Sequence, residues 1–275
     1  MQIRTKIISS LEKVFLDSSI DQFKPLTFIR MMKNQRLSVQ LAHTVDGDDA
    51  PLRIVPQLKI NGALADYARA RTVELVPVAY PIDPAIPDDN YLSKKPGLYP
   101  DWLQPLHYGA GISVMRGQLR AVWVEFMPDG NLPAGTYETE IAFVGGMGET
   151  ITSDKIIIEI LDACLPEQEM LLTQWFHCDC LANYYNCEPW SERHWRIVEN
   201  FARTARENGI NLLLTPIFTP PLDTAIGGER TTNQLIDVTV TDGEYTFGFD
   251  KLDRWIEMCD RVGIKYFEIS HLFPQ

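Results

Sequence analysis

The sequence predicts a β-sandwich domain followed by a partial α/β barrel of the TIM type that stops after about three strands. Two observations lead to this prediction. Up to about Leu161 the apolar residues recur at every second position, which is typical of strands with one buried face. From Met170 onward apolar strands alternate with amphipathic helices, and each helix ends on Gly-Ile before the next strand. That alternation is typical of parallel βα units.

The first domain, residues 1–165, is predicted to contain about seven strands. Strict alternation of apolar and polar residues indicates antiparallel sheets with one buried and one wet face. Turn signals such as Asp46-Gly47 and Asn61-Gly62 separate the candidates. The clearest strands lie at 37–41, 122–126, 137–143 and 156–160, and shorter ones at 26–32, 52–60 and 72–78.

A proline-rich stretch, 77–105, interrupts this domain and holds seven of the eighteen prolines. Because proline removes a ladder donor, the stretch is predicted to be a long ordered loop rather than a strand. Three aromatic residues in or beside it, Tyr99, Trp102 and Tyr108, form a candidate platform for a sugar. The alternative, which the general behaviour of large aromatics favours, is that they pin the loop to the sandwich.

Composition excludes several classes of function. The net charge is 25 minus 37, or −12, and the sequence has no cluster of Lys and Arg. Nucleic acids and anionic membranes are therefore not expected as partners, whereas a neutral carbohydrate is compatible. No apolar run approaches the roughly 18 residues of a membrane span, and the first ten residues are too polar for a signal peptide. Five cysteines, an odd number, form no disulfide framework. We expect a cytoplasmic protein without a cofactor; the sequence does not indicate its oligomeric state.

The second domain, residues 166–275, carries two amphipathic helices. The first is predicted at 192–208 with Ser191 as N-cap, and the second begins after an N-cap at Asp250. Apolar strands are predicted at 212–218 and 264–269, with a long loop between the first of them and the second helix. The residues expected on the buried stripes are Trp195, Val198, Phe201, Ala202 and Ala205 of the first helix, and Leu252, Trp255, Ile256, Cys259 and Val262 of the second.

In a βα barrel the active site lies at the carboxyl ends of the strands. The first such end is the segment 171–180, which is predicted to be a strand. Alternation would place Trp175, His177 and Asp179 on one face, with His177 and Asp179 projecting into the barrel mouth. Cys178 and Cys180 would then lie on the other face, packed under helices.

The same segment permits a metal-site interpretation. Cys178, Cys180 and Cys187 together with His177 are zinc-binding residue types, but Cys-x-Cys on a strand is a poor spacing for a tetrahedral pair. Buried thiols that behave as small apolar side chains are the favoured interpretation. We therefore predict no metal.

The second strand end is followed by a stiff polar loop, 215–235, with Pro220-Pro221 at its start and Gly227-Gly228 in its middle. Such loops concentrate binding residues. The candidates are Asp223, Glu229, Arg230 and Gln234. The alternative is an internal network, Glu229–Arg230 or Asp223–Arg230, that merely orders the loop.

The third strand end contains Glu268 within an otherwise apolar strand. A carboxylate there is expected to face the barrel interior and to be paired. It is a candidate acid or base if its neighbours shift its pKa. The alternative is a structural glutamate tied to an arginine.

These segments resemble glycoside hydrolase family 123, the β-N-acetylgalactosaminidase type. The resemblance covers essentially the whole chain, because such proteins carry a β-sandwich before the barrel. The barrel motifs are its specific part. They are the stretches 174–179, 218–224, 228–230 and 267–273.

The resemblance implies hydrolysis of terminal β-linked N-acetylgalactosamine by a substrate-assisted retaining route, in which the sugar's acetamido oxygen attacks the anomeric carbon. It also implies an adjacent Asp-Glu pair on the next barrel strand. After Phe273 the family pattern continues with a threonine, where this chain has Pro274 and then Gln275 as its last residue. No catalytic residue is therefore predicted in this chain, and we expect it to be an inactive fragment. The resemblance implies pocket-lining roles for Trp175, His177, Asp179, Asp223, Glu229, Arg230, Gln234, Glu268 and His271.

Two other functions are compatible with the residues. One is a non-catalytic carbohydrate-binding protein that uses the sandwich loops around Tyr99. The other is a metal-dependent hydrolase that uses His177, Cys178 and Asp179.

Overall fold

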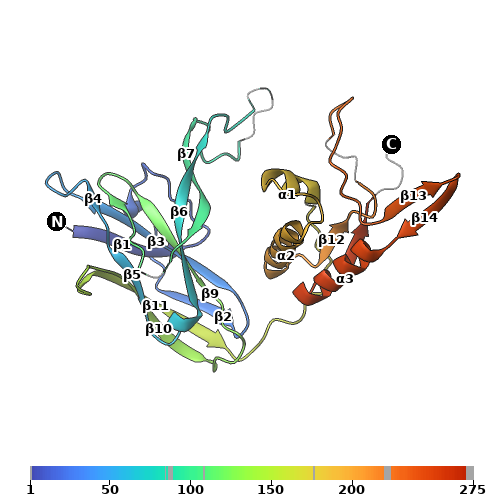
Figure 1. The fold of residues 1–275 in the computed structure, drawn as a ribbon. Helices are drawn as coiled ribbons and strands as arrows, with labels where there is room; N and C mark the ends of the chain where they lie inside the picture. The colour runs from blue at the N-terminus through green and yellow to red at the C-terminus, as the bar shows by residue number, and fades with distance from the viewer. Residues whose placement is uncertain are drawn as a thin grey trace. The chain divides into compact units, whose positions relative to one another are not determined.

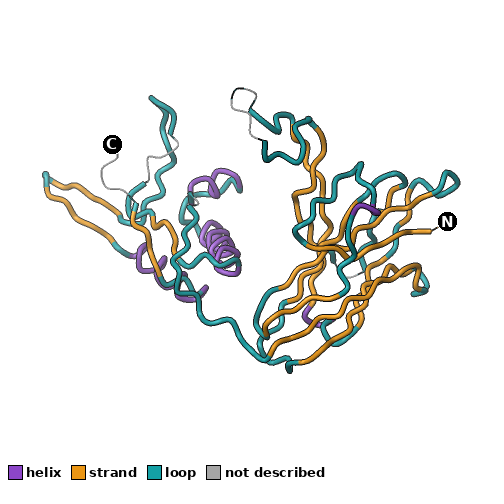
Figure 2. The backbone as a smooth tube through the Cα atoms, turned by 180° about the vertical axis from the view of Figure 1, so that it is seen from behind, coloured by secondary structure: helices purple, strands orange, loops and turns teal. Residues whose placement is uncertain are grey.

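The computed structural model describes residues 2–83, 85, 89–107, 109–175, 177–219 and 224–270. The chain divides into two compact units, Met1–Pro166 and Glu167–Gln275 (Figure 1). Strands dominate the first unit, whereas the second combines helices and strands (Figure 2). No helix within the described residues is long and apolar enough to cross a membrane.

One sheet of the first unit has five strands in the order β1-β3-β9-β6-β7, and every neighbouring pair is antiparallel. The ladders run without a break between β1, β3 and β9, so the three strands form its regular part. The five strands are β1 (Gln2–Ser9), β3 (Leu37–Asp46), β9 (Arg120–Phe126), β6 (Ala68–Val78) and β7 (Gly97–Pro105).

The other sheet has four strands in the order β2-β11-β10-β5. Its β2–β11 pair is parallel, an exception to the antiparallel pairing that the sequence predicts, and its other pairs are antiparallel. Its strands are β2 (Phe28–Met32), β11 (Thr150–Leu161), β10 (Gly135–Val144) and β5 (Gln57–Asn61). The short elements are the strand pair β4 (Arg53–Ile54) and β8 (Val114–Met115), and the 3-10 turns Ile20–Gln22 and Ala65–Tyr67.

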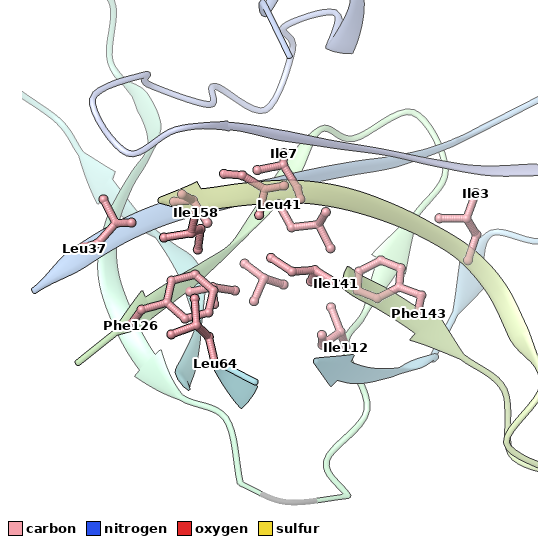
Figure 3. Close-up of a cluster of buried hydrophobic side chains, with 14 of the residues drawn as sticks. Ile3, Ile7, Leu37, Leu41, Leu64, Ile112, Phe126, Ile141, Phe143 and Ile158 are labelled. Carbon is pink, nitrogen blue, oxygen red and sulfur yellow. The ribbon is translucent and has the colours of Figure 1, made fainter. Parts of the chain in front are cut away.

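Both sheets contribute to one large apolar core (Figure 3), and a second buried cluster of the first unit includes Ile8, Phe23 and Val73. Side chains alternate along β11, so every second one faces this core. Ile156 and Ile158 are fully buried, whereas Ile157 between them is exposed. Burying each such side chain contributes about 1.5–3 kcal/mol relative to leaving it exposed. The core residues labelled in Figure 3 are Ile3, Ile7, Leu37, Leu41, Leu64, Ile112, Phe126, Ile141, Phe143 and Ile158. The two β-sheets of the first unit thus share this core.

The predicted long loop at 77–105 is wrong at both ends. Strand β6 continues to Val78, and β7 pairs with it from Gly97 to Pro105. Strand β7 lies at the edge of its sheet, so it needs ladder bonds on one side only. Edge strands accept proline because a missing N–H can face away from the neighbour. Pro100 and Pro105 are therefore accommodated, with a register shift between Val73 and Leu75 on β6.

The second unit contains a short parallel sheet. Strand β12 (Leu212–Thr215) pairs in parallel with β15 (Tyr266–Ile269), and Thr173 forms a parallel bridge to Leu212 on the other side of β12. Helices lie between the parallel segments: α1 (Cys178–Tyr184) and α2 (Glu192–Glu207) before β12, and α3 (Asp250–Val262) before β15. The connection from β12 to α3 also contains an antiparallel hairpin, β13 (Asp237–Thr241) and β14 (Glu244–Gly248).

The two predicted amphipathic helices are confirmed as α2 and α3. The Ser191 side chain caps α2 by accepting a hydrogen bond from the backbone N–H of His194. Helix α3 begins at Asp250 itself, with Phe249 at the N-cap, one residue from the prediction. Two residues expected on the buried stripes, Phe201 and Ile256, are exposed. The buried stripes consist of Trp195, Val198 and Ala202 on α2, and Trp255, Met258, Cys259 and Val262 on α3.

The predicted strand at 171–180 is wrong beyond its first residues. Among the residues of this segment that the structure describes, which exclude Phe176, only Thr173 forms a ladder bridge, and α1 begins at Cys178. Cys178, Leu181 and Ala182 are all buried and have the i, i+3, i+4 spacing of one helix face. This helical spacing prevails over the short period-2 pattern, so Asp179 does not share a strand face with Trp175.

Candidate functional site

The carboxyl ends of β12 and β15 lie next to each other, because parallel strands end at the same edge of a sheet. The backbone N–H of Ser270 donates to the carbonyl of Thr215 at 3.2 Å. The Ser270 hydroxyl donates to the carbonyl of Phe218 at 3.1 Å. These bonds join the segments that leave the two strands.

Glu268 contacts the segment that precedes α1. Its Oε2 atom accepts a hydrogen bond from the indole Nε1 of Trp175 at 2.7 Å and one from the Thr173 hydroxyl at 3.1 Å. Glu268 reaches these donors across β12, where it pairs with Leu214 in the ladder. The donors that define its position are therefore neutral groups from the first parallel segment. The structure brings together two residues, Trp175 and Glu268, that the sequence predicts for one pocket.

Asp179 and Arg230 form the second pair. Arg230 Nε lies 2.7 Å from Asp179 Oδ2, and Arg230 Nη2 donates to Oδ1 at 2.9 Å. Asp179 is only 3% exposed, and Asn233 Nδ2 also donates to its Oδ1 at 3.2 Å. A two-point guanidinium–carboxylate contact fixes direction as well as distance. Arg230 thus has a partner on α1, beyond the neighbours within its own loop that the sequence suggests.

Further bonds hold the loop that carries Arg230. The Thr231 hydroxyl donates to Asn183 Oδ1 on α1 at 3.3 Å. The backbone N–H of Asn233 donates to the Thr219 hydroxyl at 3.1 Å, and that of Leu235 to the carbonyl of Pro216 at 2.9 Å. Together with the ion pair, these contacts tie the loop to α1 and to the exit of β12. Asn183, Thr219 and Asn233 were not among the candidates, since amides and hydroxyls in loops carry no distinctive sequence signal.

The remaining candidates are not brought into these pairs by a described contact. His177 is the N-cap residue of α1, Glu229 is exposed, and Gln234 Nε2 donates to the carbonyl of Ile236 at 2.9 Å. Asp223 and His271 lie outside the described residues. For these five residues a substrate contact stays a prediction.

The cysteines of this segment differ from one another in burial. Cys178 is buried, and burial, followed by the nearby Asp179 carboxylate, raises the pKa of its thiol. Cys180 is exposed on α1, so the expectation that it packs under helices is wrong. Helical geometry turns Cys180 away from Cys178, whereas a strand would place both on one face. Within the part of the chain that the structure describes, no group of three or more His, Cys, Asp and Glu side chains has metal-binding geometry.

His194, which the sequence did not single out, connects α1 to α2. Its Nδ1 accepts from the backbone N–H of Trp190 at 2.9 Å, so its Nε2 carries the proton and donates to the carbonyl of Cys178 at 2.8 Å. Burial lowers the pKa of His194 below its ordinary value. The neutral imidazole therefore uses both of its nitrogens in hydrogen bonds. The bond to Cys178 holds the first turn of α1, which carries Asp179.

The contacts of the described site hold its charged side chains in place. The Asp179 carboxylate has both oxygens engaged by Arg230, and the Glu268 carboxylate is engaged by an indole and a hydroxyl. The Glu268 carboxylate thereby fixes the position of the Trp175 indole, and the Asp179 carboxylate fixes that of the Arg230 guanidinium. An aromatic ring beside neutral hydrogen-bonding groups is suited to a polar, uncharged ligand with apolar faces.

The second unit is similar in sequence to a known domain. Residues 175–275 match the model of "Glycoside hydrolase 123, catalytic domain". This part of the chain is thus similar to the catalytic domain of glycoside hydrolase family 123. No protein of curated function matches the chain.

Among solved structures, the chain is similar to a family 123 glycoside hydrolase from Clostridium perfringens, described in terms of glycolipid glycan hydrolysis. The TM-score is 0.75 at 13% identity, and the match covers 99% of this chain and 49% of that enzyme. The chain thus spans about half the length of the enzyme, and at this identity the likeness concerns the fold.

Two further solved structures match with TM-scores too low to indicate a shared fold. The N-terminal domain of PorA has a TM-score of 0.26 at 8% identity, covering 57% of this chain and 97% of that one. A mutant of the SrpA adhesin from Streptococcus sanguinis has a TM-score of 0.27 at 9% identity, with 91% of both chains covered.

Proposed function

We propose that residues 166–275 are the first part of a (β/α)8 catalytic domain of a glycoside hydrolase, preceded by a β-sandwich domain at residues 1–165. The observation that carries this proposal is the match of residues 175–275 to the family 123 catalytic domain. The order of the parallel segments supports it: Thr173 pairs with β12, β12 pairs with β15, and helices connect them. A barrel needs about eight such units, so this chain would contribute about three strands.

The proposed substrate is a glycan with a terminal β-linked N-acetylgalactosamine. In the substrate-assisted retaining route, the acetamido oxygen forms a bond to the anomeric carbon while the glycosidic bond breaks. The departing oxygen takes a proton from a glutamic acid, and an adjacent aspartate orients the acetamido group. Water then opens the cyclic intermediate and restores the acetamide.

The Asp-Glu pair of this route is proposed to lie outside residues 1–275. Two observations support that placement. The sequence contains no adjacent Asp-Glu, and the chain spans 49% of the family 123 enzyme to which its fold is similar. The proposal therefore assigns recognition to this chain and proton transfer to a further segment.

Within this scheme the two observed pairs build the sugar pocket. Trp175 supplies a ring for the apolar face of the sugar, and Glu268 holds the indole by its N–H. Arg230 and Asp179 hold the loop that follows β12 against α1. His177, Glu229 and Gln234, together with Asp223 and His271, are proposed to complete the pocket.

The test uses the purified chain with two small probes. N-acetylgalactosamine is titrated while ¹H–¹⁵N NMR follows the indole N–H of Trp175, and a chromogenic aryl β-N-acetylgalactosaminide is offered as substrate. We expect the sugar to shift that indole signal, and no release of the chromophore. Absence of any shift at saturating sugar contradicts the recognition role. Release of chromophore contradicts the placement of the catalytic pair.

A second candidate function is glycan binding by the first unit alone. The observation that favours it is a cavity of about 700 Å³ beside β7, lined by Phe15, Asp17, Lys94, Lys95 and Tyr99 among others. Of the aromatic residues that the sequence suggests as a platform, Trp102 is exposed, the Tyr99 hydroxyl bonds to Ser93 at 2.7 Å, and Tyr108 lies outside the described residues, so the platform stays a prediction. Glycan-array binding that the Tyr99→Ala variant loses would favour this candidate, whereas binding that it keeps would not.

A further inference from the structure

The connection between α1 and α2 holds a bulky residue in a strained backbone conformation. Trp190 has φ of 60°, in the left-handed region that is an outlier for a large L side chain. Such a conformation persists only where the surrounding contacts determine it. The Trp190 ring packs against those of His194, Trp195 and Trp255, at centroid distances of 5.2, 4.6 and 6.2 Å. Packing thus holds the side chain of Trp190.

His194 holds the backbone of Trp190. It is the third residue of α2, it is fully buried, and its Nδ1 accepts the Trp190 N–H at 2.9 Å. The backbone N–H of His194 in turn donates to the Ser191 hydroxyl at 3.3 Å. This arrangement is similar to a capping box, in which a glutamate or glutamine at the third helical position accepts a backbone N–H from the start of the helix. Here the acceptor is a histidine, which stops accepting at Nδ1 once that nitrogen is protonated.

The other ring nitrogen extends this contact to the candidate site. Nε2 of His194 donates to the carbonyl of Cys178 at 2.8 Å, in the first turn of α1. The next residue, Asp179, carries the carboxylate that Arg230 binds at two points. A continuous series of contacts therefore runs from Trp190, through the neutral ring of His194, to the loop that carries Arg230.

The surroundings of the His194 ring oppose its protonation. Burial is the largest effect and lowers the pKa of His194. The start of a helix also disfavours positive charge. The hydrogen bond to Cys178 and the Asp179 carboxylate favour the proton, but Arg230 already neutralises that carboxylate. The net result is a ring that is neutral in the folded protein.

The other ionisable groups of the surrounding elements do not compensate for this effect. The buried thiols of Cys178 on α1 and Cys259 on α3 stay neutral, because burial raises their pKa values. Glu192 of α2 is engaged by Arg254 of α3. Glu188, in the connection between α1 and α2, is exposed to solvent.

We propose that His194 is a positioning residue that makes the candidate site sensitive to acid. Its neutral ring holds the first turn of α1 against the start of α2, whereas the protonated ring cannot accept the Trp190 N–H. Protonation therefore releases α1, and with it the Asp179–Arg230 pair. This inference goes beyond the function proposed above, because it concerns the geometry of the site whatever its ligand.

The test measures hydrogen exchange by NMR on the whole chain at about pH 7.5 and 5.5, on either side of the ordinary pKa of histidine. The reporters are the Arg230 Nε–H and the amides of Cys180 and Tyr185, which donate to backbone carbonyls at 3.1 and 3.0 Å within α1. Amides of α3 report unfolding of the whole unit. The variant His194→Gln keeps an acceptor and a donor but does not titrate. The matched control is His107→Gln, at an exposed histidine of the first unit.

In the released form the His194 ring is in water and takes up its proton near pH 6.5. We therefore expect the wild-type α1 amides to exchange about tenfold faster at the lower pH, relative to those of α3 and after correction for intrinsic rates. The His107→Gln control should respond as the wild type does, and the His194→Gln variant should not respond. An equal acid response in His194→Gln and the wild type, or none in the wild type, overturns the proposal.

A second measurement needs no variant. The imidazole ¹⁵N signals of the wild type report the protonation of His194, and the Arg230 Nε–H signal reports the ion pair. We expect the two to change with the same midpoint as the pH is lowered. An Arg230 signal that is unaffected when His194 takes up its proton overturns the proposal.

The consequence for binding rests on the function proposed above. N-acetylgalactosamine, titrated at each pH, should bind more weakly below the midpoint of His194, and the His194→Gln variant should show no such change. Constant affinity through that midpoint overturns the role of His194 in binding. A wild-type chain that binds no sugar at any pH contradicts the proposed function, and the exchange measurement still decides whether His194 positions α1.

Discussion

Asp179 and Arg230, which are 51 positions apart, meet in a two-point ion pair with atom separations of 2.7 and 2.9 Å. The pair connects α1 to the loop between β12 and the hairpin. Because its carboxylate is almost fully buried, removing one partner leaves the other charge without compensation.

Asp179→Asn is therefore expected to lower the free energy of unfolding by about 3 kcal/mol or more. Urea unfolding followed by tryptophan fluorescence measures it. Glu192→Gln is the matched control, since Glu192 makes a two-point contact to Arg254 with a 77% exposed side chain. Exposed ion pairs contribute about 0–1 kcal/mol to stability. If both variants lost the same unfolding free energy, burial of the Asp179–Arg230 pair would not be what makes it important.

The Trp175–Glu268 hydrogen bond is expected to couple the first parallel segment to β15. Trp175→Phe keeps an aromatic ring and removes the donor, and Glu268→Gln removes the charge. Because the site is partly exposed, we expect a coupling free energy of about 1 kcal/mol between the two substitutions. A double-mutant cycle of urea unfolding measures it. Additive effects within error would show that the bond contributes nothing to stability.

His43 makes the stability of the first unit sensitive to acid. It is 2% exposed on β3, with its ring 5.4 Å from that of Phe143, and burial lowers its pKa to about 3. In the unfolded chain the pKa is about 6.5. The unfolded state therefore binds the extra proton first, and stability present above pH 6.5 is lost as the pH falls toward 3. The expected loss is about 1.4 kcal/mol per pH unit.

His43→Leu should remove this slope. The measurement is hydrogen exchange of β3 amides between pH 6.5 and 5, corrected for intrinsic exchange rates, where most carboxylates are still ionised. The wild type is expected to lose about 2 kcal/mol over this interval and the variant much less. Equal slopes in both proteins would contradict a neutral buried His43.

The turn of the β13–β14 hairpin depends on its glycine. Asp242 has φ of 52° and Gly243 has φ of 84°, as a type I′ turn requires. Gly243→Ala should therefore cost about 1 kcal/mol of hairpin stability, because an L side chain is strained there. Cross-strand NMR contacts between Val240 and Tyr245 report the outcome. If the variant kept the same cross-strand contacts and the same amide exchange rates in the hairpin, the type I′ turn assignment would be contradicted. Gly146→Ala, at a glycine without positive φ and with open space around its Cα, is the control.

The parts of the fold that could be predicted are those in which one pattern dominates. Helices α2 and α3 have apolar positions at helical spacing over 16 and 13 residues, and their bounds were predicted closely. Segments with competing patterns were predicted less well. The short segment 178–184 is compatible with both a strand pattern and a helix pattern. The packing of Cys178 and Leu181 into the apolar core of the second unit favours the helix.

The β13–β14 hairpin and strand β7 were missed for different reasons. The hairpin carried a usable signal, Asp242-Gly243 between alternating residues, but it lies inside a stretch assigned to a loop. Strand β7 carried a misleading signal, because proline excludes a central strand but not an edge strand. Position within a sheet is a tertiary property that sequence spacing does not encode.

The candidate site was predicted in composition but not in pairing. For Arg230 the sequence suggested a binding role or, as the alternative, a partner within its own loop such as Glu229. Its observed partner is determined by the location of α1, whose helical character was itself missed. Pairing of Glu268 with Trp175 likewise depends on Thr173 lying beside β12.

The parallel pairing of β12 with β15 has a consequence for synthesis on the ribosome. Thr215 ends the first strand and Tyr266 begins the second, so about fifty residues must be made before β12 meets this partner. At the usual rates of elongation that interval lasts roughly 3–10 seconds. During it the edge of β12 is open to other strands, including those of neighbouring nascent chains. We expect chaperone engagement of this segment to be brief and to end as β15 emerges.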